Sequence, residues 1–268
     1  MLNINSEVKE YIGKNSMITS KMNKEDRKFM AMKFYAVPDA PNPNKSTIYR
    51  GIPEKDDVPP RDTNIDFVIS DTVSTLSLYP NRKVGLLNYA SYKNPGGKFL
   101  EGSKAQEEDL CLLSSLYKHL EQQKQFYAMN RTDLNRGLYR NVGITTRDVM
   151  FYPEFFHAPV PATVFTVPAP NWGAARRNNV SYGANLTAMC DRIELLLVMA
   201  EKAKVDTLVA GAWGCGVFKQ NIEDVARCFC RVLASMNLSY DIVFAIPDAD
   251  SLNKFKRAFE DYYQTYYK

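Results

Sequence analysis

Residues 84–98 read VGLLNYASYKNPGGK, an apolar run that passes directly into a glycine-rich loop. The run Val84–Tyr89 has the length and composition of a buried strand. The paired Gly96 and Gly97 allow backbone conformations with positive φ and let a ligand approach the main chain closely. In open parallel sheets, ligands bind beyond the carboxyl ends of the strands. The stretch therefore predicts a buried strand that is followed by a ligand-binding loop.

Short apolar runs of the same character occur at four other places, namely Ile65–Ile69, Thr163–Val167, Thr207–Ala210 and Ile242–Ile246. Apolar residues at helical spacing predict helices over residues 110–120, 186–200 and 225–236, and a last helix that starts near Asp250. Strands that alternate with helices imply βαβ units. The sequence therefore predicts an α/β fold with a mainly parallel sheet and helices on both faces.

The N-terminal part differs in character from the rest of the chain. We interpret residues 1–62 as a helical and proline-rich extension that packs on the main domain, residues 63–268. The extension holds one or two short amphipathic helices, of which Lys24–Ala36 has the better pattern. Six prolines follow between Pro38 and Pro60, and so many prolines prevent a regular helix or a central strand. This segment is either an ordered loop that wraps the domain or a linker.

The overall composition excludes several classes of protein. The chain has 268 residues, of which 45% are hydrophobic and 24% are charged, as in a globular protein with a sizeable core. A net charge of +4 suits an anionic ligand, but the basic residues are scattered, so we do not expect nucleic acid as a partner. No apolar run reaches the roughly 18 residues of a membrane span. The start, Met1–Lys14, resembles neither a signal peptide nor an anchor.

The cysteines and histidines bear on location and on metal binding. An odd number of cysteines, five, without a signal peptide is typical of reduced thiols, so we expect a cytoplasmic protein. Cys228 and Cys230 are two apart on a predicted helix, face different directions and would chelate poorly. With only two histidines in the chain, we expect neither a metal site nor a cofactor.

A pair of acidic residues opens the helix that follows the first glycine loop. Ser103 and Gln106 fit a capping box, which places Glu107 and Glu108 in the first helical turn. Acidic side chains at this position commonly do no more than complement the helix dipole. Because this pair follows a glycine loop at the end of a strand, a second interpretation is that one carboxyl group acts as a general acid or base.

Two further loops follow predicted strands. Residues 211–218 read GAWGCGVF, and a strand, three glycines and a helix near Asn221 together offer backbone N–H groups to phosphate. The alternative is a tight turn that needs glycine. Cys215 has no histidine near it in sequence and is interpreted as a loop residue rather than a nucleophile. Residues 168–173 read PAPNWG and predict a rigid turn, in which Trp172 either stacks on a base or caps the core.

Taken together, these motifs resemble the signature of poly(ADP-ribose) glycohydrolases of the bacterial, macrodomain-only type. That signature is a glycine triplet, a short spacer and Gln-Glu-Glu, and residues 94–98 (NPGGK) with Gln106–Glu108 match it here. Further matches, spread over about residues 64–259, are LNYA at 87–90, EEDLC at 107–111, SSLY at 114–117, PAPN at 168–171, GAWGCGVF at 211–218 and VFAI at 243–246 with Asp248.

The resemblance implies a macrodomain-like, three-layer α/β/α fold with a mixed, mostly parallel central sheet. It implies a hydrolase that cleaves ribose–ribose bonds, with ADP-ribose, its polymers and ADP-ribosylated proteins as ligands or partners. By the same resemblance, Glu108 is the catalytic acid and Glu107 completes the catalytic pair. Glu107 and Asn94 hold the distal ribose, Phe218 packs on that ribose, and Gly214–Phe218 bind the diphosphate. The other ligand-binding residues that the resemblance implies are Asn88, Gly96, Gly97, Lys98, Gln106, Pro170, Asn171, Gly211, Gly214, Cys215, Gly216 and Val217.

One residue departs from the family signature. The third glycine of the triplet is Lys98 in this chain. A lysine here either clashes with the ligand or adds a cation to the diphosphate. The alternative function is therefore a non-catalytic macrodomain that binds or sequesters ADP-ribose or a related nucleotide signal. The intact Gln106–Glu108 motif favours the hydrolase.

Overall fold

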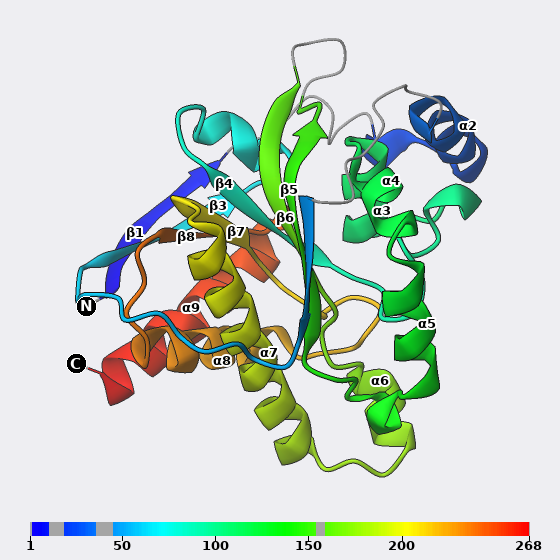
Figure 1. The fold of residues 1–268 in the computed structure, drawn as a ribbon. Coiled ribbons are helices and arrows are strands. Elements are labelled where there is room, and N and C mark those ends of the chain that lie inside the picture. Colours follow the sequence, from blue (N-terminus) through cyan, green and yellow to red (C-terminus); the bar gives the residue numbers. More distant parts are fainter. Residues whose placement is uncertain (1, 11–18, 36–44, 154–158, 268) are drawn as a thin grey trace.

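One sheet runs through the described part of the chain, residues 2–10, 19–35, 45–153 and 159–267 of this computed structural model. Its eight strands, in spatial order, are β1 (Leu2–Glu10), β3 (Thr63–Ile69), β8 (Asp241–Ala245), β7 (Thr207–Ala210), β4 (Val84–Tyr89), β6 (Val160–Val167), β5 (Val142–Phe151) and β2 (Ser46–Arg50). The strands from β1 to β6 in this order run parallel, and β5 is antiparallel to both β6 and β2. The sheet is therefore mixed and mostly parallel, as predicted (Figure 1).

Helices cover both faces of this sheet. On one face lie α7 (Tyr182–Ala203), α8 (Ile222–Ala234) and α9 (Ala249–Tyr266), and on the other lie α3 (Gln106–Leu112), α4 (Leu116–Glu121) and α5 (Lys124–Thr132) (Figure 1). Side chains that alternate along β3 divide between the two cores, because Phe67 packs with the first set of helices and Val68 with the second. This is the three-layer α/β/α arrangement that the sequence predicted.

All five predicted strands form, and β4 and β7 have the predicted bounds. One helix prediction is wrong, because the helix expected over residues 110–120 is divided into α3 and α4 at Leu113. Backbone groups that the break leaves without a helical partner form hydrogen bonds with the end of β5: Tyr152 N donates to Leu113 O at 2.9 Å and Ser115 N donates to Met150 O at 3.0 Å. The Ser114 hydroxyl then accepts the Leu116 amide at 3.0 Å, which starts the second helix.

The N-terminal part supplies both edges of the sheet, which the sequence did not predict. The expected amphipathic helix forms as α2 (Lys24–Tyr35), but residues 2–10, where we expected helix or no regular structure, form strand β1. Strand β2 lies within the proline-rich segment and is an edge strand, so the exclusion of a central strand holds there. Pro38, Pro41 and Pro43 lie outside the described residues. The domain boundary after residue 62 stays a prediction.

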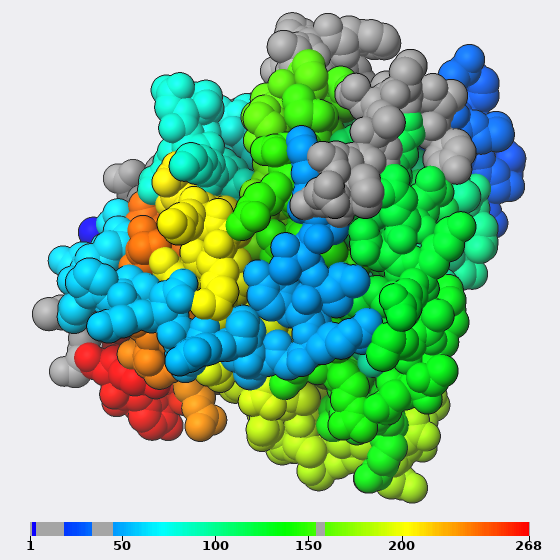
Figure 2. Space-filling model, viewed as in Figure 1, coloured from blue at the N-terminus to red at the C-terminus, as the bar shows by residue number. Residues whose placement is uncertain are grey.

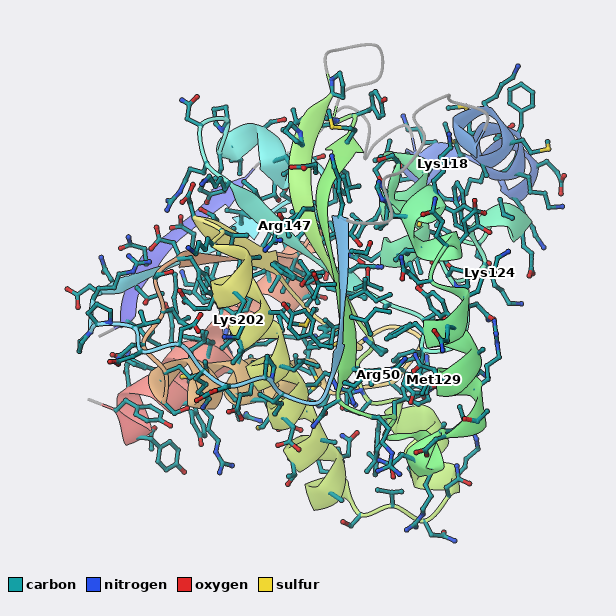
Figure 3. All side chains as sticks on the ribbon, in the orientation of Figure 1. Arg50, Lys118, Lys124, Met129, Arg147 and Lys202 are labelled. Carbon is teal, nitrogen blue, oxygen red and sulfur yellow. The ribbon has the colours of Figure 1, made fainter. Side chains whose placement is uncertain are left out.

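Residues 51–62 follow the first of the two interpretations, an ordered loop that wraps the domain. The segment crosses the face of the molecule shown in Figure 2, from β2 toward β3. It is attached to α7 through Lys55–Glu194 at 2.6 Å and Lys202–Asp56 at 2.7 Å (Figure 3 labels Lys202). Arg61 Nε also donates to Leu238 O at 2.8 Å.

The basic side chains labelled in Figure 3 come from five different elements, β2, α4, α5, β5 and α7. They are spread over the face shown. In the described part of the chain, no helix is both long and apolar enough to cross a bilayer.

Candidate functional site

Two adjoining cavities lie at the carboxyl ends of β4, β7 and β3. A cavity of about 360 Å³ is bounded by the loop after β7, and one of about 260 Å³ is bounded by the segment after β3. The residues that line both are Tyr89, Lys104, Ala105 and Gln106, so the two cavities meet at the N-terminus of α3. Together they are large enough for a nucleotide, since small-molecule sites typically measure roughly 300–1,000 Å³.

Gln106 connects the helix that carries the acidic pair to the central strand. Its side chain accepts the Tyr89 amide at 2.8 Å and donates to Leu87 O at 2.7 Å and to Thr72 Oγ1 at 3.1 Å. The predicted capping box is therefore wrong, because the residue that caps α3 is Ala105 and no side chain caps the helix. Gln106 instead fixes the start of α3 against the end of β4.

Glu107 is buried, with 3% of its surface exposed. Ser91 N donates to its Oε2 at 2.7 Å and Asn88 Nδ2 donates to its Oε1 at 3.2 Å. The pKa of Glu107 is raised to about 8, chiefly by burial and in part by the nearby Glu108, while the hydrogen bonds from Ser91 and Asn88 oppose the rise. Glu107 therefore keeps its proton at neutral pH, and the pair carries less negative charge than two carboxylates would.

Glu108 lies directly under the first glycine loop and is 7% exposed. The Lys98 amide donates to Glu108 Oε1 at 2.9 Å. Gly97 has φ +61°, and a Cβ there would lie 2.5 Å from Glu108 Oε1. At Gly96, with φ +63°, a Cβ would lie 2.6 Å from the Tyr117 ring. Both glycines are thus required for the loop to fold onto the carboxylate.

Lys98, the departure from the signature, does not need the left-handed backbone conformation of the two glycines before it. Its φ is −115°, which a residue with a side chain adopts readily. The side chain is exposed, and its Nζ lies 3.4 Å from Glu101 Oε2. In this structure the lysine side chain is thus paired with Glu101, and the backbone contact to Glu108 is kept. The effect of Lys98 on a bound ligand stays a prediction.

The loop after β7 presents unpaired backbone donors, as predicted for a phosphate site. Within the described residues, the amides of Gly214, Gly216, Val217 and Phe218 donate to no protein acceptor. All four residues line the larger cavity. The following helix, α8, is capped by Asn221, whose side chain accepts the amides of the second and third residues after it at 2.9 and 3.1 Å.

Cys215 does not line either cavity. Its Sγ lies 3.8 Å from Trp213 O, and burial raises the pKa of the thiol to about 12. A thiol that keeps its proton is a poor nucleophile. This agrees with the interpretation of Cys215 as a loop residue.

Phe218 is half-buried and lines the larger cavity, and two further aromatic rings that line neither cavity support it from behind. Its ring centroid lies 5.9 Å from that of Tyr139, and the two planes are inclined by 67°. Tyr139 stacks on Tyr92 at 4.2 Å with an interplanar angle of 6°. Tyr139 also has φ +62°, an uncommon value for a residue with a side chain, so the fold holds it in place against local strain.

The structure places the remaining predicted residues as follows. Asn88 is buried against Glu107, whereas Asn94 is exposed beside the loop. Gly211 has no room for a side chain, because a Cβ would lie 2.5 Å from both the Tyr89 hydroxyl and Ala245 O. Pro170 and Asn171 line neither cavity.

The turn that contains Pro170 and Asn171 is held by contacts within the protein. Pro170 O accepts Gln220 Nε2 at 2.8 Å. Asn171 caps α6 (Trp172–Arg177) by accepting the Ala174 amide at 3.0 Å. Trp172 packs edge-on against Tyr182 with centroids 4.9 Å apart. The ligand-binding roles of Pro170 and Asn171 stay predictions.

The sequence analysis missed residues that line the second cavity, chiefly Asp71, Thr72 and Lys104. Asp71 Oδ1 accepts the amides of Val73 and Ser74, at 2.9 and 3.0 Å. Its Oδ2 is buried and has no hydrogen-bond partner among the described residues. Asp71 follows β3, so the rule that directed attention to the other strand ends would have found it.

Among the described residues, no group of three or more His, Cys, Asp or Glu side chains is placed to hold a metal ion. The five cysteines form no disulfides with one another.

Comparison with known proteins identifies the relatives of this chain. The chain is similar in structure to poly(ADP-ribose) glycohydrolase from Thermomonospora curvata, with 24% identity, a TM-score of 0.75, and coverage of 89% of this chain and 99% of the other. It is also similar to the Deinococcus radiodurans enzyme in complex with ADP-ribose, with 28% identity, a TM-score of 0.65, and coverage of 90% and 91%. No curated protein sequence matches. Residues 10–154 match the model of the microbial-type PARG catalytic domain, and the chain belongs to that family.

Proposed function

We propose that this protein hydrolyses ribose–ribose O-glycosidic bonds in ADP-ribose polymers, with Glu108 as the single acid and base. The observation that carries the proposal is the position of Glu108, buried beneath Gly97 and fixed by the Lys98 amide at 2.9 Å. Membership of the microbial-type PARG catalytic family supports it, as does the similarity to a Deinococcus enzyme in complex with ADP-ribose.

The two cavities provide separate places for the parts of ADP-ribose. The unpaired amides of Gly214, Gly216, Val217 and Phe218 suit the diphosphate, because such groups bind anions without further charge. The second cavity suits the adenosine part, since the unpaired Asp71 Oδ2 would accept a hydrogen bond from an amino or hydroxyl group. The distal ribose then lies between Phe218 and the Glu107–Glu108 pair, with Asn94 at its edge.

In the proposed reaction Glu108 first gives up a proton and later takes one back. Protonated Glu108 donates its proton to the bridging oxygen as the ribose–ribose bond breaks, which releases one product with a free hydroxyl group. The remaining ribose carries an oxocarbenium-like centre, which the adjacent diphosphate stabilises. Glu108, now a carboxylate, removes a proton from the attacking water, and the second product leaves. General acid and base steps of this kind contribute roughly 10²- to 10⁴-fold to a rate.

Glu107 supports this step as a neutral group. Because its pKa is about 8, Glu107 is protonated at pH 7 and adds no second negative charge beside the diphosphate. Its oxygens are held by Ser91 N and Asn88 Nδ2, so its orientation is fixed before a ligand enters. We assign it to binding the distal ribose rather than to proton transfer.

The alternative function is a macrodomain that binds or sequesters ADP-ribose without cleaving it. Lys98 and the N-terminal extension are the two sequence features that favour it. Lys98, however, keeps the amide contact to Glu108 while its side chain is paired with Glu101. ADP-ribosylated proteins are a further substrate class that the same site would accept. A cytoplasmic location, where the five cysteines would stay reduced, also belongs to the proposal.

The test is calorimetric titration of ADP-ribose, followed by incubation with an ADP-ribose polymer and measurement of released ADP-ribose. We expect Glu108→Gln to bind ADP-ribose within about threefold of the wild type and to lose at least about 10²-fold in kcat. The matched control is Glu101→Gln, which removes an exposed carboxylate from the same loop. Binding without release by the wild type would establish the sequestering function instead. The absence of binding would refute both.

A further inference from the structure

Arg27 of α2 is a buried arginine that contacts the helix of the acidic pair. It is 3% exposed, and its guanidinium donates to Asp109 Oδ1 at 2.6 Å, to Ser103 O at 3.0 Å and to Thr19 O at 3.4 Å. Asp109 directly follows Glu108 in α3. Figure 1 shows α2 beside α3 and α4, and α2 contacts both α3 and the short turn Phe99–Glu101 of the first loop. A residue of the N-terminal part thus reaches the base of the proposed catalytic site.

Hydrogen bonds connect Arg27 to Glu108 by a second route, through the loop. The Lys98 amide donates to Glu108 Oε1 at 2.9 Å, and Lys98 O accepts the Ser103 amide at 3.3 Å. Ser103 O then accepts Arg27 Nε. With the Arg27–Asp109 ion pair, these contacts close a ring that runs from the Glu108 carboxylate through the loop and Arg27 and back to α3.

The main chains of α2 and the loop also meet directly. Gly102 has φ +74°, and a Cβ at that position would collide with the carbonyl oxygen of Lys24. Lys104 Nζ donates to Ser20 O. The loop is therefore seated against the start of α2, and it cannot shift without disturbing the ring.

The start of α3 depends on such outside contacts. Ala105 supplies no side-chain cap, so the first turn is held by Gln106 on one side and by Asp109 on the other. A guanidinium suits this place, because its donors are fixed in one plane and can serve a carboxylate and a carbonyl at once. A lysine has one nitrogen and cannot reproduce this geometry.

We propose that Arg27 is a positioning residue for the hydrolytic reaction: it fixes the Lys98–Ser103 loop against α3 and thereby aims the Glu108 carboxyl group. This inference rests on the proposed catalytic role of Glu108. It also gives the N-terminal part of the chain a role in the reaction, although Arg27 itself touches neither cavity.

The test compares Arg27→Ala, Arg27→Lys and Asp109→Asn with the control Lys33→Ala, which removes an exposed charge from the far end of the same helix. For each folded variant, kcat and KM for polymer hydrolysis, the Kd of ADP-ribose, and deuterium uptake of residues 98–104 are measured. We expect Arg27→Ala to lower kcat by about 10- to 100-fold, since a displacement of about 1 Å in a catalytic group can cost about 10²-fold. KM and Kd should stay within about threefold.

Deuterium uptake distinguishes positioning from a loss of overall stability. It should rise in residues 98–104 of Arg27→Ala and stay unchanged in Lys33→Ala. Arg27→Lys should recover part of kcat. The double variant Arg27→Ala/Asp109→Asn should be no slower than the slower single variant, because both changes open the same ring.

The inference is overturned if Arg27→Ala, or Arg27→Lys should the alanine variant not fold, keeps wild-type kcat or wild-type uptake in the loop. It is also overturned if the effects of Arg27→Ala and Asp109→Asn multiply. A wild-type protein that binds ADP-ribose and releases none from polymer refutes the proposed function first. In that case uptake alone decides whether Arg27 holds the loop, and the assignment to the reaction falls.

Discussion

Replacing Glu107 with glutamine should change how the stability of this protein depends on pH. The folded protein holds the Glu107 pKa at about 8, mainly by burial, whereas the ordinary value is 4.5. Between these two values the folded state binds a proton that the unfolded state releases. The contribution of Glu107 to stability is therefore complete below about pH 4.5, declines as the pH rises, and is lost above about pH 8. At about 1.36 kcal/mol per pKa unit, the decline amounts to about 5 kcal/mol as an upper limit.

Glutamine at position 107 has no proton to lose and should not show this decline. Its amide oxygen can still accept the Ser91 N–H bond that Glu107 accepts at 2.7 Å. The measurement is urea unfolding at a series of pH values between 5 and 9, with tryptophan fluorescence as the signal that reports unfolding. We expect the wild type to lose more unfolding free energy over this range than Glu107→Gln, by about 2–4 kcal/mol. Titrating groups that do not interact with Glu107 are common to the two proteins and cancel in the difference.

The control is Glu101→Gln, which removes an exposed carboxylate and should follow the wild-type profile. Parallel profiles of the wild type and Glu107→Gln would refute the reasoning, because they would mean that Glu107 ionises normally in the folded state. The same titration bears on the ligand. Ionised Glu107 would repel a diphosphate, so the affinity of the wild type for ADP-ribose should fall above pH 8, whereas that of Glu107→Gln should not.

Three further substitutions test the loops. Gly97→Ala should lower kcat at least tenfold and cost about 1–3 kcal/mol of stability, because the added Cβ would lie 2.5 Å from Glu108 Oε1 at a φ of +61°. Steady-state hydrolysis measures the first effect and urea unfolding the second. Wild-type kinetics would contradict the prediction. Lys98→Gly should leave kcat within about threefold, because the amide that binds Glu108 is kept; a tenfold change in either direction would show that the lysine side chain takes part. Tyr139→Ala should raise KM severalfold and lower the unfolding free energy by about 3 kcal/mol, because the ring that supports Phe218 at 5.9 Å is removed. An unchanged KM would show that Tyr139 does not contribute to ligand binding.

The central strands could be predicted from sequence because both of their faces are covered. Strand β7 is buried along its whole length and β4 up to its last residue, Tyr89, and both read as continuous apolar runs. Strand β1 carries Asn3, Asn5, Ser6 and Glu7 among its nine residues, and nothing in that mixture distinguishes it from a loop or a polar helix. It is an edge strand, which has a neighbour on one side only, so its place comes from pairing with β3 rather than from its own pattern.

The same limit applies to the site. The loops that contain Gly97 and Gly214 were found because they follow strands directly, a relation that is local in sequence. Arg27 and Ser103 are 76 residues apart, and Arg27 and Asp109 are 82 residues apart. No local pattern in one sequence announces a contact between such distant residues. The predicted capping box failed for a related reason, because the Gln106 side chain is engaged by β4 rather than by its own helix.

The two glycines and the lysine of the signature triplet show why a family motif can vary at one position and not at its neighbours. Gly96 and Gly97 have φ of +63° and +61°, and a Cβ on either would meet Tyr117 or Glu108. The third residue has φ −115°, so the fold requires from Lys98 only an amide directed at Glu108 and a path for the side chain to solvent. Any residue other than proline supplies that amide. Positions 96 and 97 therefore fix the shape of the loop, whereas the main chain at position 98 accepts a residue with a side chain.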